Sequence, residues 1–114
     1  MIELTKPQKK IARQLISLAL QRECEDFLNS TRNFLREAES NGEDAHANYL
    51  SLFKKVNDFD RHIARYYDGM SGSRYLITVL NRYCAGTLTD KDIALFDEDM
   101  QKYLNDTKKL LMEE

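Results

Sequence analysis

The chain has 114 residues, of which 32% are charged and 42% hydrophobic, and its formal net charge is −2. This length suits one domain with one buried core, and the hydrophobic share excludes a disordered chain. The nearly balanced charge excludes a general attraction to polyanions, and no apolar run approaches the roughly 20 residues that a membrane-spanning helix needs. We therefore expect a single domain over residues 1–114 that binds no membrane.

The two cysteines point to the cellular compartment. Cys24 and Cys84 both fall at apolar positions of helical patterns. Small buried thiols are typical of a reducing compartment, whereas a secreted domain of this size uses cysteines in a disulfide framework. We expect a cytoplasmic protein without a targeting segment.

The first helix is predicted to begin at Thr5-Lys6-Pro7-Gln8, which has the Thr-x-x-Gln spacing of a capping box. Apolar residues then recur at steps of three and four as far as Ala38. This periodicity predicts one helix of about 35 residues, or roughly 52 Å, which ends at Ser40-Asn41-Gly42. Ser40 or Asn41 is a candidate cap for the next helix.

The second helix is predicted from about Glu43 to Asp68, and its apolar spacing is the most regular in the chain. The short connection makes it an antiparallel neighbour of the first helix. Its predicted core positions are Ala45, Tyr49, Leu52, Val56, Phe59, Ile63 and Tyr66.

Two more helices are predicted after the loop that contains Gly69 and Gly72. The third is short, has Ser71 or Ser73 as a candidate cap, and ends at Ala85-Gly86. The fourth begins at Thr89-Asp90-Lys91-Asp92, a capping box with aspartate as its last residue, and continues to Leu110 as one helix. The resulting fold class is all-α, a four-helix up-and-down bundle with a long first and a short third helix.

The length difference between the first two helices suggests an interaction surface. The second helix is the shorter one, so the apolar N-terminal part of the first helix needs another cover, either the fourth helix or a second subunit. We expect a non-enzymatic interaction or regulatory module that binds a protein partner or forms a homo-oligomer. The candidate interface residues are Ile11, Leu15, Ile16 and Leu18.

The less favoured alternative is binding of nucleic acid or of a phosphorylated ligand at a basic pole, which the start of the first helix, the end of the second and the start of the third would form. Arginines alternate with tyrosines between Arg61 and Arg82, a composition that can hold phosphates and stack on bases. Free backbone N–H groups at the start of the third helix would add an anion site. The candidate binding residues are Arg61, Arg65, Ser71, Gly72, Ser73 and Arg74. The competing interpretation is structural, with core tyrosines and arginines paired to nearby aspartates.

Catalytic and metal-binding motifs give no positive signal. The chain contains no Gly-x-Ser-x-Gly, Cys-x-x-Cys or His-Glu-x-x-His sequence. Glu43 and His46 have the spacing of a di-iron ligand pair, but a second such pair is missing. Asp58 and His62 could share a metal, although a surface ion pair explains them equally well. We expect no catalytic residues, no metal and no cofactor.

Overall fold

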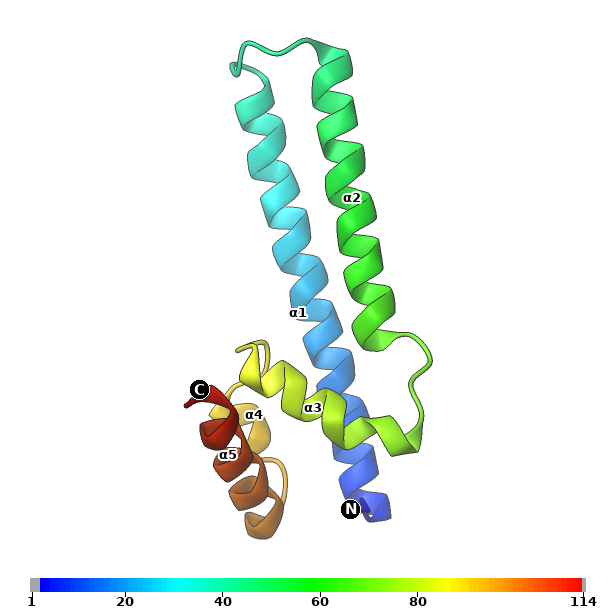
Figure 1. The fold of residues 1–114 in the computed structure, drawn as a ribbon, viewed down its shortest axis with the longest axis vertical. Coiled ribbons are helices and arrows are strands. Elements are labelled where there is room, and N and C mark those ends of the chain that lie inside the picture. Colours follow the sequence, from blue (N-terminus) through cyan, green and yellow to red (C-terminus); the bar gives the residue numbers. More distant parts are fainter. Residues whose placement is uncertain (1–2, 114) are drawn as a thin grey trace. The chain divides into compact units, whose positions relative to one another are not determined.

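The chain is all-α, as its periodicity predicts. A computed structural model describes residues 3–113, and within that range it contains α-helices, one 3₁₀ turn and no strand (Figure 1). The elements in order are α1 (Lys6–Ala38), α2 (Ala45–Tyr67), the 3₁₀ turn (Gly72–Arg74), α3 (Tyr75–Cys84), α4 (Asp90–Ile93) and α5 (Glu98–Met112). The first helix is long and the third is short, as expected.

These helices form two compact units. The hairpin unit, Arg22–Asp68, holds the second part of α1 and the whole of α2. The core unit consists of the chain up to Gln21 together with the chain from Gly69 onward. The helix α1 therefore contributes one segment to each unit.

Most of the buried side chains lie in the core unit, where α3 packs against α5. The first part of α1 contributes small and branched residues, and the later helices contribute larger ones. The buried hydrophobic residues of this unit are Ala12, Leu15, Ile16, Ala19, Val79, Leu80, Tyr83, Leu88, Ile93, Phe96, Met100 and Leu104. This set forms a compact hydrophobic core.

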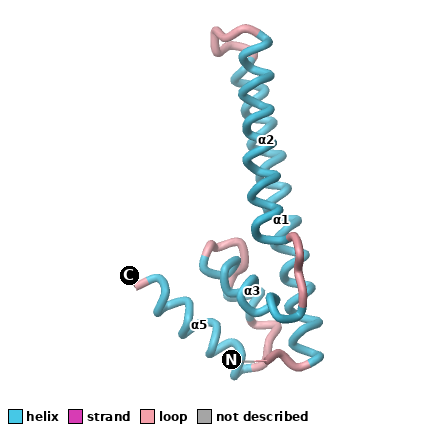
Figure 2. The backbone as a smooth tube through the Cα atoms, turned by 45° about the vertical axis from the view of Figure 1, so that its right-hand side comes forward, coloured by secondary structure: helices cyan, strands magenta, loops and turns pink. Residues whose placement is uncertain are grey.

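The hairpin unit is thin by comparison. Its two helices run antiparallel side by side, as the short connection predicts (Figure 2). The rings of Phe27 and Phe59 stack between them, with centroids 4.3 Å apart and planes 7° apart. Within this unit only Tyr67 is buried, so two helices alone enclose almost no core.

Both predicted capping boxes are confirmed. The Thr5 backbone N–H donates to Gln8 Oε1 at 2.9 Å, and the Gln8 N–H donates back to Thr5 Oγ1 at 3.3 Å. Thr89 and Asp92 make the equivalent reciprocal pair at the start of α4. Such pairs satisfy backbone donors that have no partner inside the helix, which is why they mark helix starts reliably.

The predicted caps of the second and third helices are wrong. Asp44, rather than Ser40 or Asn41, caps α2 and accepts a hydrogen bond from the Ala47 N–H at 2.7 Å. Neither Ser71 nor Arg74, the residues before the 3₁₀ turn and before α3, makes a side-chain capping bond. The 3₁₀ turn itself leads the chain into α3, so that helix begins without a serine cap.

The expected fourth helix is in fact two helices, α4 and α5. The break falls at Asp97, whose backbone is extended at φ −64° and ψ 165° and whose side chain accepts from the Met100 N–H at 2.8 Å. Asp97 is therefore an N-cap, and Glu98 and Asp99 follow it as acidic residues of the first turn. These three residues were the available sequence signal for a new helix start.

Candidate protein-interaction surface

The residues predicted to bind anions are divided between the two units. Arg61 and Arg65 belong to the hairpin unit, whereas Ser71, Gly72, Ser73 and Arg74 belong to the core unit. The guanidinium of Arg61 lies 3.9 Å from Asp58, and that of Arg65 lies 5.4 Å from the centre of the Tyr66 ring. Both arginines thus have structural partners on their own helix.

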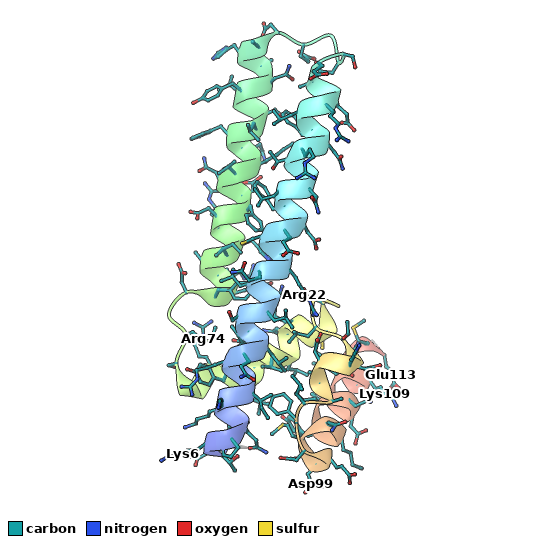
Figure 3. The ribbon with its side chains drawn as sticks, turned by 180° about the vertical axis from the view of Figure 1, so that it is seen from behind. Lys6, Arg22, Arg74, Asp99, Lys109 and Glu113 are labelled. Atoms are coloured by element: carbon teal, nitrogen blue, oxygen red, sulfur yellow. The ribbon has the colours of Figure 1, made fainter. Side chains whose placement is uncertain are left out.

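The loop before α3 has its own internal contacts. Arg74 donates from Nη1 to the Gly69 carbonyl at 3.4 Å, and the Ser71 and Ser73 hydroxyls lie 3.0 Å apart (Figure 3). Gly72 begins a three-residue 3₁₀ turn, which is too short to gather the aligned N–H groups of a helix N-terminus. Arg74, Ser71 and Ser73 thus have partners within the loop.

The residues predicted for a partner interface are covered by the chain itself. Leu15 is 1% exposed and Ile16 8% exposed inside the core unit, and Ile11 and Leu18 are half-buried. The two candidates for covering this segment were the fourth helix and a second subunit. Later helices of the same chain belong to the same unit and cover it. Leu15 and Ile16 consequently offer no surface to a partner.

A large apolar surface is instead exposed on the hairpin. Besides Leu50, five large hydrophobic side chains of α1 and α2 are each about half exposed, with Leu28 at 62% and Phe53 at 53%. We call this set the apolar face. Its residues are Leu28, Leu35, Tyr49, Phe53 and Val56. The regular spacing predicted Tyr49 and Val56 as core positions, and the structure leaves both open.

Each residue of the apolar face directly follows a residue at the contact between α1 and α2. Phe27 stacks on Phe59, Lys55 lies over the Phe34 ring at 5.4 Å, and Asn48 donates to the Ala38 carbonyl at 3.4 Å. The residues that precede the five are Phe27, Phe34, Asn48, Leu52 and Lys55, of which the first four are half-buried.

This one-residue offset places all five side chains on the same side of the hairpin. Successive residues of an α-helix point about 100° apart. Because antiparallel helices turn in opposite senses when viewed from one end, a step of one residue from the contact turns both helices toward the same face. The apolar face is therefore built from both helices on one side of the hairpin.

The opposite side of the hairpin is polar. Ser30 and Ser51 are exposed there, and Lys54 pairs with Asp58 at 2.7 Å. Helical spacing places Arg61 and Arg65 on the same side. Five large apolar residues gathered on one side of the hairpin differ from scattered exposed leucines, which are normal on any protein.

The carboxylate of Glu23 links α1 to the C-terminal part of α2. Glu23 of α1 contacts His62 Nε2 at 2.6 Å through Oε1, and its Oε2 accepts a hydrogen bond from the Tyr67 hydroxyl. The Glu23 side chain is 15% exposed and that of His62 35%. Helical periodicity could not predict this group, because His62 and Tyr67 lie 39 and 44 positions after Glu23 in the sequence.

The core unit contains a cavity of about 460 Å³ between α3, α4 and α5. The Tyr83 hydroxyl donates a hydrogen bond to the Asp90 carboxylate there, and Lys108 Nζ lies 4.2 Å from the centre of the Tyr83 ring. Asn105, Lys109 and Met112 complete the lining (Figure 3 labels Lys109). Burial, followed by the adjacent Asp90 carboxylate, raises the pKa of Tyr83 to about 12. Tyr83 is therefore a protonated donor at neutral pH.

The raised pKa of Tyr83 predicts a late tyrosine titration. In the folded protein, ultraviolet absorbance should show a tyrosine component ionising near pH 12, and Tyr83→Phe should lower its amplitude by the absorbance of one tyrosine. The folded-state pKa lies above the ordinary value of 10.0, so this group's contribution to stability is present below pH 10.0 and falls as the pH rises through about 12. An unchanged amplitude of the late component in Tyr83→Phe would contradict this assignment.

Other site chemistries find little support in the described residues. Across residues 3–113, no group of three His, Cys, Asp or Glu side chains could hold a metal ion, and Asp58 and His62 have the separate partners given above. In the same part of the chain, no helix is long and apolar enough to cross a membrane. Comparisons of this chain with protein-family models, curated proteins and solved structures find no match.

Proposed function

We propose that the protein is a non-enzymatic interaction module whose contact surface is the apolar face of the α1–α2 hairpin. The observation that carries the proposal is the concentration of Leu28, Leu35, Tyr49, Phe53 and Val56 on one side of a two-helix unit. An exposed apolar surface of this kind is unfavourable in water and is typical of a protein–protein contact.

The four-helix up-and-down arrangement belongs to the same proposal. The hairpin supplies two antiparallel helices with an uncovered face, which is the surface that a further pair of helices covers in a four-helix bundle. A helical partner bound there would complete the arrangement outside the single chain.

We place this module in the cytoplasm. Cys24 and Cys84 are both free thiols, which suits a reducing compartment. The nucleic-acid alternative has less support, because Arg61 lies near Asp58 and Arg65 lies over the Tyr66 ring, both on α2.

Site-specific photocrosslinking in intact cells tests the proposal. A benzophenone amino acid in place of Phe53 should form a covalent adduct with a bound protein, because this position lies at the centre of the apolar face. The same amino acid in place of Ser51, two residues away on the polar side, is the matched control and should form none. Absence of an adduct at position 53, or equal adducts at both positions, would overturn the proposed function.

A further inference from the structure

We infer that the protein bound to the apolar face is a second copy of this chain, related to the first by a two-fold axis. The inference rests on the proposed function and names the partner at the same surface. In a two-fold dimer the same patch is used by both subunits, so the patch must match itself. An apolar face made of two antiparallel helices meets that requirement, since packing two such hairpins together gives four helices around one core.

The extent of the face fits a dimer. Aromatic side chains have on the order of 150–250 Å² of surface each, and leucine and valine have less, so five that are half exposed offer up to about 500 Å² per copy. Two copies together then bury up to about 1,000 Å², which is the lower bound for a specific interface. Neighbouring rim residues, including the half-exposed Leu50, add to this area.

The hairpin also needs a cover for its own stability. Among the described residues of the unit, Tyr67 alone is buried, and small units of this kind usually depend on oligomerisation or another external constraint. A second copy is present whenever the protein is present. Helical spacing places the exposed Arg32 and Asp60 on the same side as these five residues, and their opposite charges do not select a strongly acidic or basic partner.

Light scattering coupled to size-exclusion chromatography tests the inference on the full chain at micromolar concentrations. The wild-type protein should have twice the chain mass of 13.4 kDa. Phe53→Glu and Leu28→Glu should each give the monomer mass, because they place a carboxylate in the apolar contact. Ser51→Glu and Ser30→Glu add the same charge to the polar side of the same helices and should remain dimeric.

Circular dichroism of each variant separates loss of association from loss of folding. If a glutamate variant fails to fold, Phe53→Ala and Leu28→Ala replace it, and each should raise the dimer dissociation constant about tenfold or more. A monomeric wild-type chain would overturn the inference, and so would dimeric face variants. If the chain is monomeric while position 53 still crosslinks to a protein of another mass in cells, the second-copy inference fails and the proposed function stands.

Discussion

Leu15→Asp is expected to unfold the core unit. Leu15 is 1% exposed and lies in α1 among the buried residues of that unit. Losing a buried leucine side chain costs about 2–5 kcal/mol, and burying a polar group without a partner adds about 1–3 kcal/mol. The sum is comparable to the whole stability of a small domain, which is about 5–15 kcal/mol.

Amide NMR spectra provide the measurement for Leu15→Asp. Resonances of α3 and α5 should lose their dispersion, and urea unfolding should begin at a much lower concentration than in the wild type. Gln14→Asp is the matched control, because it places the same carboxylate one residue earlier at an exposed position of α1. A folded, monomeric Leu15→Asp protein would mean instead that Leu15 serves a contact between subunits.

The contrast between Leu15 and Phe53 explains which part of the interaction surface the sequence could predict. Apolar periodicity identifies the side of a helix that is covered, but it carries no information about what covers it. Because α1 is longer than α2, its first part was expected to lack a cover. The later helices of the same chain bury it. The regular pattern of α2 looks like core, yet Tyr49 and Val56 stay open because α1 contacts only one edge of that apolar side.

The two capping boxes were predicted from the sequence, whereas the break between α4 and α5 was not. The capping boxes at Thr5 and Thr89 involve residues three positions apart, so their sequence signals are complete in themselves. The break between α4 and α5 was missed because Ile93, Phe96 and Met100 keep the helical spacing of three and four across it. All three are buried, and the N–H of Phe96 bonds to the Ile93 carbonyl in a turn that preserves this spacing.

The group of Glu23, His62 and Tyr67 shows why long-range polar contacts lie beyond such reasoning. Helical spacing places Glu23 four residues before Phe27, on the side of α1 that contacts α2, but this spacing does not identify its partners. Its role follows from the alignment of two helices, which brings Tyr67 and His62 to the same carboxylate. That alignment also determines which residues of α1 and α2 remain on the apolar face.

Glu23→Ala is therefore expected to destabilise the hairpin unit. The substitution leaves the hydroxyl of Tyr67, a buried residue, and the Nε2 of His62 without their carboxylate acceptor. An unsatisfied buried polar group costs about 1–3 kcal/mol, with the smaller share from His62 because its side chain is 35% exposed. A total of about 2 kcal/mol corresponds to a roughly 30-fold increase in the opening equilibrium.

Hydrogen exchange measures this effect element by element. Amides of α2 should exchange roughly 30-fold faster in Glu23→Ala, while those of α3 and α5 in the core unit should change little. Glu25→Ala removes an exposed carboxylate two residues away and is the matched control. Glu23→Gln keeps one acceptor oxygen for Tyr67 and should recover part of the protection. Equal exchange in Glu23→Ala and Glu25→Ala would show that the carboxylate does not hold α2 against α1, and the apolar face would then depend on the Phe27–Phe59 stack for its alignment.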